Sequence, residues 1–196
     1  MEPSGLQLQE KLVNPYIVFS LQRNDSVSYC LIFRYNSIGQ EGLFMTKDEQ
    51  FIEIAIKLAL KAREDGNEPF GAILVKNNEI VMFGENKINS YCDPTHHAEI
   101  GLIRDFCSEN NIFDLGEYTM YTSCEPCVMC TGAMVWSNLG KIVYSVAHDQ
   151  LAKIAGSNIM ISCKEVIEKS PNKPVVVEQV LNVEGLKVFE GYKFAH

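Results

Sequence analysis

The segment SCEPCVMC, residues 123–130, constrains this chain most, because it gathers three of the seven cysteines. Pro126 stands where a helix can open, since proline is preferred at the first helical position. In such a helix Cys127 and Cys130 are three residues apart and project from one face. The unpaired N–H groups of a helix N-terminus favour the thiolate over the thiol. The spacing therefore predicts a pair of metal-binding thiolates on one helix.

The segment DPTHHAEIG, residues 93–101, supplies the residue types that this pair lacks. Zinc is the expected metal for a mixture of thiolate and imidazole ligands. With His97 the pair makes three protein ligands, and a catalytic zinc site keeps its fourth position for water. Glu99 is close enough in sequence to take a proton from that water and deliver it to a substrate. The two segments together predict a catalytic zinc centre.

Residue types alone leave two alternatives open. His96 does not fit the His-x-Glu register, so we interpret it as a surface residue or as a residue behind the site. The cluster could instead be a structural zinc clip with a fourth protein ligand, for which His96, Cys92 and Cys124 are candidates. Cys124 lies outside the predicted helix face and is interpreted as a site-lining or packed thiol. The same structural interpretation applies to Cys30, Cys92, Cys107 and Cys163.

The net charge and the number of cysteines limit the classes of protein to which this chain can belong. The net charge of −8 at pH 7 means that the molecule as a whole repels polyanions. An odd number of cysteines without a secretion signal favours reduced thiols. The N-terminus MEPSGLQLQEKL lacks the basic and apolar regions of a signal peptide, and no apolar run approaches the ~20 residues that span a bilayer. We expect a cytoplasmic protein without a membrane partner.

Hydrophobic patterning changes near residue 45. Before it, the apolar runs Tyr16–Phe19 and Tyr29–Tyr35 flank a polar turn, which predicts a hairpin. After it, Thr46 and Glu49 form a capping box, and apolar residues at helical spacing continue to Gly66. The segments FGAILVK and EIVMFGEN then predict a strand and a returning strand joined by a tight turn at Asn77-Asn78. Strands and helices alternate from there up to a last helix near residues 183–190. This alternation predicts an α/β sandwich with a mostly parallel sheet.

The motifs PFGAILV, GEN, DPTHHAE and YTSCEPCVMCTGAMVWS resemble the cytidine-deaminase-like superfamily from about Thr46 to about Lys164. The pattern H-x-E followed by P-C-x-x-C is a signature of zinc nucleobase deaminases. The chain is most similar to the branch that holds bacterial guanine deaminases, other base or nucleoside deaminases and tRNA adenosine deaminases. The resemblance implies a three-layer α/β/α sandwich with a five-stranded mixed sheet, one Zn²⁺ per chain, and a homodimer. Residues 1–44 are then an N-terminal appendage, either a hairpin or partly disordered, and residues 45–196 the zinc-dependent deaminase domain.

The resemblance also implies roles for single residues. His97, Cys127 and Cys130 would hold the metal, and Glu99 would shuttle the proton. The residues that would contact the substrate are Asn86 through its side-chain amide, Phe70 as an apolar wall, Ala98 through its backbone N–H, and Trp136 near the base. Without the resemblance, we would interpret Asn86 as a turn residue at the end of a strand, and Phe70 and Trp136 as core residues.

Two departures from the guanine deaminase pattern bear on the substrate. In AGSNIMIS, residues 155–162, Asn158 and Ile159 stand where a carboxylate that contacts the purine would be expected. At the C-terminus, Phe189, Tyr192 and Phe194 form either a lid or a packed helix. We expect a free nucleobase or nucleoside as substrate, with a guanine-like purine favoured and no nucleic acid partner. A tRNA adenosine deaminase and a pyrimidine-type base or nucleoside deaminase are the alternatives.

Overall fold

The computed structural model describes residues 7–13, 16–22, 28–34, 45–156 and 159–194, and the chain forms two compact units, Met1–Phe44 and Met45–His196. The first unit contains an antiparallel sheet of β1 (Gln7–Val13), β2 (Tyr16–Gln22) and β3 (Ser28–Arg34). Strands β2 and β3 correspond to the two predicted apolar runs, and β1 was not predicted. The predicted turn and Tyr35 lie outside the described residues.

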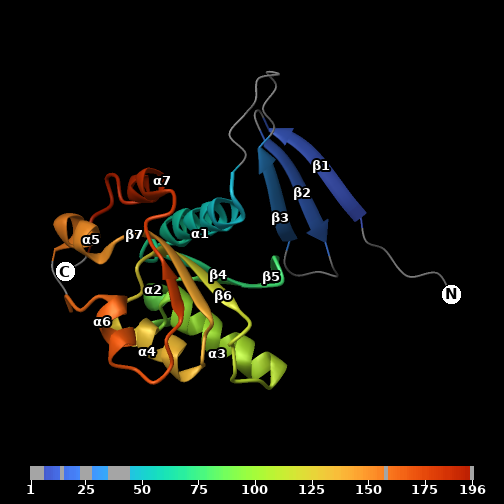
Figure 1. The fold of residues 1–196 in the computed structure, drawn as a ribbon. Coiled ribbons are helices and arrows are strands. Elements are labelled where there is room, and N and C mark those ends of the chain that lie inside the picture. Colours follow the sequence, from blue (N-terminus) through green and yellow to red (C-terminus); the bar gives the residue numbers. More distant parts are fainter. Residues whose placement is uncertain (1–6, 14–15, 23–27, 35–44, 157–158, 195–196) are drawn as a thin grey trace. The chain divides into compact units, whose positions relative to one another are not determined.

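The second unit is built on a five-stranded sheet in the order β5-β4-β6-β7-β8 (Figure 1). Its strands are β4 (Gly71–Lys76), β5 (Glu79–Glu85), β6 (Thr119–Cys124), β7 (Lys141–Val146) and β8 (Val175–Val177). β4 runs antiparallel to both β5 and β6, whereas β6, β7 and β8 are parallel. The mixed sheet implied by the resemblance is confirmed. β4 and β5 form the hairpin predicted from Asn77-Asn78, and β4 is the one strand of this sheet that runs opposite to the other four.

Helices cover both faces of this sheet, which confirms the three-layer sandwich (Figure 1). One layer holds α1 (Lys47–Glu64), α5 (His148–Ala155) and α7 (Asn182–Lys187), and the other holds α3 (Ala98–Asn110), α4 (Val128–Trp136) and α6 (Cys163–Glu168). The short helix α2 (Ile88–Tyr91) follows β5. Side chains alternate between the layers: Ile73, Tyr121 and Val143 face the α1 layer, and Leu74, Met120 and Ile142 face the α3 layer. Among the described residues, no helix has the length and apolar character needed to cross a membrane.

Two helix starts were predicted from capping patterns. The capping box of α1 is confirmed, since Glu49 N donates to Thr46 Oγ1 at 3.2 Å and Thr46 N donates to the Glu49 carboxylate at 2.6 Å. The start of α4 at Pro126 is wrong by two residues. Cys127 is the N-cap, in extended conformation, and the helix begins at Val128. The shift places the Cys127 side chain at the helix end itself, beside the unpaired N–H donors.

Gly84 controls how closely α3 approaches the sheet. A Cβ atom at Gly84 would lie 2.5 Å from the carbonyl oxygen of Ala98 and 2.9 Å from Leu102 Cβ. Only a glycine lets the first turn of α3 lie directly against β5. This contact fixes the N-terminus of α3, which carries the His-x-Glu motif, at the edge of the sheet where β5 ends.

Candidate active site and metal centre

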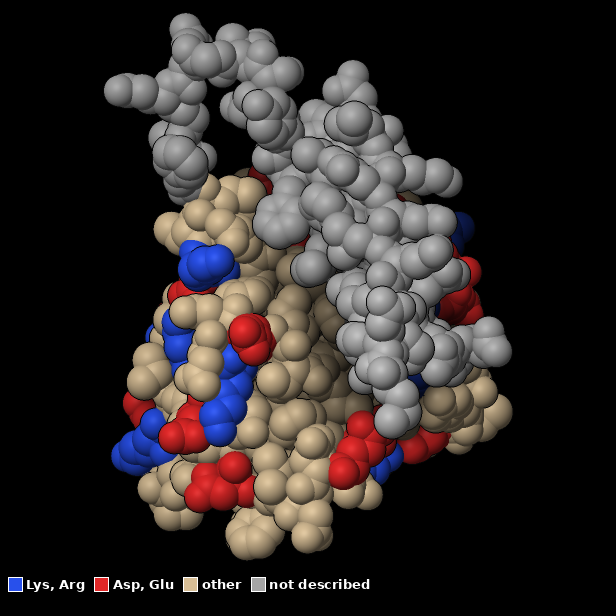
Figure 2. Space-filling model, turned by 90° about the vertical axis from the view of Figure 1, so that its right-hand side faces the viewer, with Lys and Arg blue, Asp and Glu red and all other residues tan. Residues whose placement is uncertain are grey.

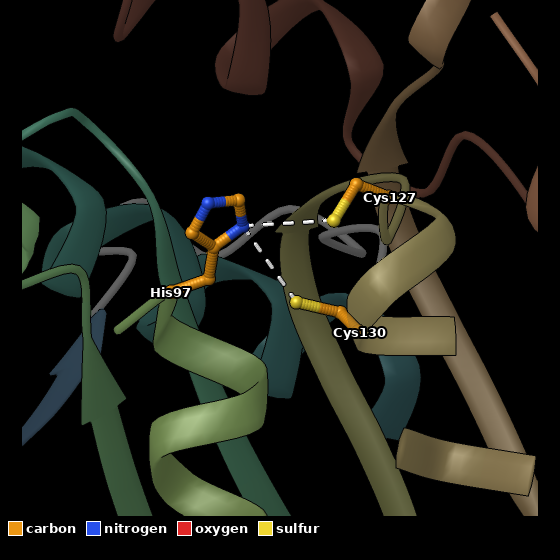
Figure 3. Close-up of side chains that lie close together, drawn as sticks. All are labelled: His97, Cys127 and Cys130. Atoms are coloured by element: carbon orange, nitrogen blue, oxygen red, sulfur yellow. Dashed lines mark hydrogen bonds between the residues drawn. The ribbon is translucent and has the colours of Figure 1, made fainter. Parts of the chain in front are cut away.

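The three predicted metal ligands meet where the N-termini of α3 and α4 approach each other (Figure 3). His97 is the N-cap of α3, Cys127 is the N-cap of α4, and Cys130 lies in the first turn of α4. His97 Nδ1 lies 3.6 Å from Cys127 Sγ and 3.7 Å from Cys130 Sγ. Ligands placed tetrahedrally at usual zinc distances would be separated by about 3.6 Å. The donor types and the spacing therefore both fit zinc.

Hydrogen bonds within the cluster favour the thiolate form of Cys127. The hydrogen bond from Cys130 lowers the pKa of the Cys127 thiol to about 4, and a hydrogen bond from His97 contributes in the same direction. The same Cys130–Cys127 hydrogen bond, together with burial, raises the pKa of Cys130. Burial lowers the pKa of the His97 imidazole, but the hydrogen bond to Cys127 and the negative charges of Glu99, Cys127 and Glu68 together raise it above its ordinary value. Cys127 is therefore a thiolate at neutral pH, the form that binds metal.

The candidates for a fourth protein ligand lie elsewhere. Cys92 is exposed, and Cys124 is a buried thiol whose pKa is raised well above its usual range by burial. His96 packs edge-on against the ring of Tyr91, at 4.7 Å between ring centroids, and lies against α3. Within the described part of the chain, no other His, Cys, Asp or Glu joins the three residues, whose ligand atoms lie within 4.8 Å of one another. This arrangement favours the catalytic type of site over a structural clip.

Glu99 lies in the first turn of α3, buried beside the cluster. Its Oε1 accepts a hydrogen bond of 2.9 Å from Thr122 Oγ1, and its Oε2 lies 3.6 Å from Cys130 Sγ. Burial raises the pKa of this carboxyl group above its ordinary value. A buried carboxylate beside the metal ligands, with a raised pKa, has the properties of a group that both accepts and donates a proton.

Of the predicted substrate contacts, Ala98 directly follows His97, and the backbone next to Asn86 pairs with the residue before His97, since Lys87 N donates to His96 O at 3.0 Å. Asn86 directly follows β5, and its backbone N–H donates to the carbonyl oxygen of Phe70 at 3.0 Å. The Asn86 side chain is 0% exposed; its Oδ1 accepts from Ile88 N, while its Nδ2 has no hydrogen-bond partner among the described residues. Ala98 is the first residue of α3, so its N–H has no acceptor within the helix. Asn86 and Ala98 thus each present a donor that a ligand could use.

A comparison with known protein families identifies the family of this chain. The model of the cytidine and deoxycytidylate deaminase zinc-binding region matches residues 45–146, about half of the chain. This span contains the three cluster residues, Glu99 and Asn86. The chain belongs to this family. It is a zinc-dependent hydrolase that deaminates a nucleobase or nucleoside, and the His97, Cys127 and Cys130 group offers the place for Zn²⁺.

Similarity to individual deaminases extends beyond the family region. The guanine deaminase of Bacillus subtilis is 34% identical over 146 residues, which is 74% of this chain and 93% of the relative. A tRNA-specific adenosine deaminase of Buchnera aphidicola is 31% identical over 146 residues, with the same shares of 74% and 93%. The structure of a guanine deaminase from Nitrosomonas europaea has the same fold, with a TM-score of 0.66 at 20% identity, covering 74% of this chain and 83% of that one.

Two predicted contacts are not brought to the cluster of this deaminase. Trp136 is the last residue of α4 and is 89% exposed, so the interpretation as a core residue is wrong. It lies at the opposite end of the helix from Cys127, about 13 Å along the axis, so the structure does not bring it to the cluster of its own chain. Asn158 lies outside the described residues.

The aromatic residues of the C-terminus pack on the predicted site wall. They follow α7, which ends at Lys187 close to the predicted last helix near residues 183–190, and Phe189 is buried. The ring of Phe70 lies 5.8 Å from that of Phe189 and 6.3 Å from that of Phe194. Arg63 holds the segment by donating from Nη1 to the carbonyl oxygen of Val188 at 2.8 Å. These contacts are consistent with a cover over Phe70 formed within one chain.

Sequence patterns did not reveal the role of Glu125, the acidic residue inside SCEPCVMC. Its buried carboxylate accepts 2.9 Å hydrogen bonds from the backbone N–H of His148, the first residue of α5, and of Cys163, the first residue of α6. Its own N–H donates to the carbonyl oxygen of Val146 at 2.7 Å. The one available signal was a charged residue in a buried, otherwise apolar segment. Glu125 thus ties two helix starts to the loop that carries Cys127.

The variant Glu125→Gln is expected to lose about 1–3 kcal/mol of unfolding free energy, because the amide oxygen can accept from only one of the two buried N–H groups. Urea unfolding measures this loss. Glu117→Gln is the matched control, since the Glu117 side chain is 79% exposed, and it should stay within about 0.5 kcal/mol of wild type. Equal stability of Glu125→Gln and wild type would contradict the prediction.

Proposed function

We propose that this deaminase acts on a free nucleobase or nucleoside, with a guanine-like purine favoured, and that it releases ammonia. The observation that carries the proposal is the buried Asn86 amide, whose Nδ2 has no hydrogen-bond partner among the described residues. A buried donor without a partner costs about 1–3 kcal/mol, which a ring nitrogen or carbonyl oxygen of a bound base would recover. The guanine deaminase relative, matched over nearly its whole length, favours the purine.

The charge of the domain favours a small substrate over tRNA. Residues 45–196 contain 14 Lys and Arg against 21 Asp and Glu, a net charge of −7. Their two arginines are engaged within the chain, Arg63 with the C-terminal backbone and Arg104 with Asp93 at 3.9 Å. On the face shown in Figure 2, acidic and basic side chains are interspersed among the described residues without a continuous basic stripe. An RNA enzyme would need such a stripe to neutralise phosphates.

The proposed reaction replaces the amino group of the base with oxygen from water. Zinc, when bound, supplies the lowered pKa that makes water nucleophilic at neutral pH. Glu99 accepts a proton from the attacking water and passes it to a ring nitrogen, while the oxygen bonds to the amino-bearing carbon. Glu99 next moves the remaining hydroxyl proton to the amine, the carbon–nitrogen bond breaks, and ammonia leaves. The Asn86 amide and the Ala98 N–H hold the base throughout.

A substrate panel tests the proposal. Purified protein is incubated with purine and pyrimidine bases, their nucleosides and a tRNA stem-loop, and ammonia release is followed. We expect turnover of at least one free purine base or nucleoside, with guanine preferred. Turnover of the stem-loop alone would establish the tRNA deaminase alternative, which the Buchnera relative represents. Turnover of cytosine or cytidine alone would establish the pyrimidine alternative.

We further propose that residues 1–44 are an appendage and that residues 45–196 form the deaminase domain. The family match begins at residue 45, and all contacts of the site described above lie within the second unit. A chain truncated to begin at Met45 should fold and keep kcat/KM within about threefold of the full chain, a difference below roughly 0.7 kcal/mol. Circular dichroism and ammonia release measure the two properties. A truncated chain that folds but has no activity would overturn this assignment.

The oligomeric state and location stay predictions. The family resemblance implies a homodimer, and light scattering coupled to size-exclusion chromatography would show a mass twice that of the 22.1 kDa chain. A monomer at micromolar concentration would contradict it. The N-terminal sequence predicts a cytoplasmic location, which fractionation of cells would test.

A further inference from the structure

Thr122 lies at the centre of the sheet and makes a contact that the proposed reaction does not yet use. It sits in β6 between Ala72 of β4 and Tyr144 of β7, and it is 0% exposed. Its hydroxyl lies 2.9 Å from Glu99 Oε1 and 3.5 Å from the carbonyl oxygen of Gly71. A hydroxyl has only one hydrogen to donate. The Glu99 carboxylate is both the nearer and the stronger acceptor, so Thr122 donates its hydrogen bond to Glu99.

This contact makes the two oxygens of Glu99 unequal. Oε1 is held by the sheet through Thr122, whereas Oε2 lies 3.6 Å from Cys130 Sγ, on the side of the metal ligands. We propose that Thr122 is a positioning residue that anchors Glu99 by Oε1, so that Oε2 alone receives the proton from water and delivers it to the substrate. The inference rests on the proposed function of Glu99 as the proton shuttle.

The chemistry of threonine suits this role through the whole cycle. The hydroxyl is neutral, so it orients the carboxylate without forming an ion pair that would compete for the proton. When Oε2 carries the proton, Oε1 is the carbonyl oxygen of the acid and still accepts from Thr122. The branched side chain is also restricted at χ1 and stands on a strand that is paired on both sides. The anchor therefore stays in place while the proton moves.

Two variants at Thr122 test the anchor with guanine, or with whichever substrate of the panel is turned over. Thr122→Val keeps the shape and loses the hydroxyl, so kcat should fall by about tenfold or more, as expected for a misplaced reacting group, while KM stays within about threefold. Zinc content should remain at that of wild type. Thr122→Ser keeps a hydroxyl and should recover kcat to within about threefold of wild type. The control is Ser145→Ala, which removes a buried hydroxyl that donates to Leu181 O at 3.0 Å, and it should leave kcat unchanged.

A double variant separates an effect through Glu99 from a general loss of packing. In the Glu99→Gln background, Thr122→Val should change the residual kcat by less than about threefold, because residues that act as a unit are not additive. A further tenfold loss there would overturn the inference. A kcat of Thr122→Val within about threefold of wild type would do the same.

A spectroscopic measurement needs no substrate and keeps this test separate from the proposed function. The infrared band of the Glu99 carboxylate is identified as the band that Glu99→Gln removes. Its frequency should shift in Thr122→Val and should be the wild-type frequency again in Thr122→Ser. An unshifted band means that Thr122 does not hold Glu99, whatever the substrate. A shifted band with no turnover of any panel substrate would support the anchor and refute the proposed function.

Discussion

Glu99→Gln is expected to lower kcat by about 10²–10⁴-fold, the usual contribution of a general acid–base group. Glutamine keeps the shape of the side chain, and its amide oxygen can still accept from Thr122 Oγ1. It cannot accept and release a proton at neutral pH, so the steps at the ring nitrogen and at the leaving amine lose their carrier. Fold and zinc content should stay close to wild type. Ammonia release under saturating substrate, with metal analysis of the same sample, measures both properties.

The exposed Glu117 supplies the control for this substitution, since Glu117→Gln changes the same functional group at a distance from the cluster. A kcat for Glu99→Gln within about tenfold of wild type, a loss of only ~1.4 kcal/mol, would remove Glu99 from the central role. Loss of zinc in Glu99→Gln would assign the carboxylate to metal binding instead.

Cys127→Ala should abolish zinc binding and with it the deaminase activity. Of the three ligand side chains, the Cys127 thiol has the pKa lowered to about 4, so it is the anionic ligand present at neutral pH. Its removal leaves one imidazole and one buried thiol, too few to hold zinc in the tetrahedral arrangement. We expect less than about 0.1 zinc per chain after desalting, as expected when one of three ligands is lost. Plasma mass spectrometry of the purified protein measures the content.

Cys92→Ala is the matched control, because Cys92 is exposed and separate from the cluster, and it should retain full zinc. A Cys127→Ala variant that retains full zinc would argue against the site. Zinc loss in Cys124→Ala would indicate that a fourth protein ligand completes a structural clip.

The metal centre could be predicted because its parts are local in sequence. Cys127 and Cys130 stand within one turn of α4, and His97 and Glu99 stand within the start of α3, so residue spacing alone determines which side chains share a face. The capping box at Thr46 is local for the same reason. Pairing the two segments needed more than spacing, and the motif resemblance supplied it.

Sheet direction and helix starts were predicted less well. The alternation of strands and helices does not determine which strands become neighbours, and β6 pairs antiparallel with β4 although a helix lies between them in the chain. Pro126 is suited to a first helical turn, but Cys127 caps α4 in extended conformation. Trp136 has the residue type of the core, yet it is 89% exposed, because residue type alone does not say which part of a helix surface is covered.

The sequence by itself predicted the ligand types and the α/β class from residue chemistry and short-range periodicity, and the motif resemblance added the proposed role of Glu99. Only the tertiary structure decided which groups orient that chemistry. Thr122 meets Glu99 across 23 positions of sequence, and Glu125 reaches His148 and Cys163 across 23 and 38. The periodicity of apolar residues predicts that such side chains are buried, but it does not predict which groups they contact. That information appears only when strands and helices distant in sequence pack together and every buried polar group must find a partner.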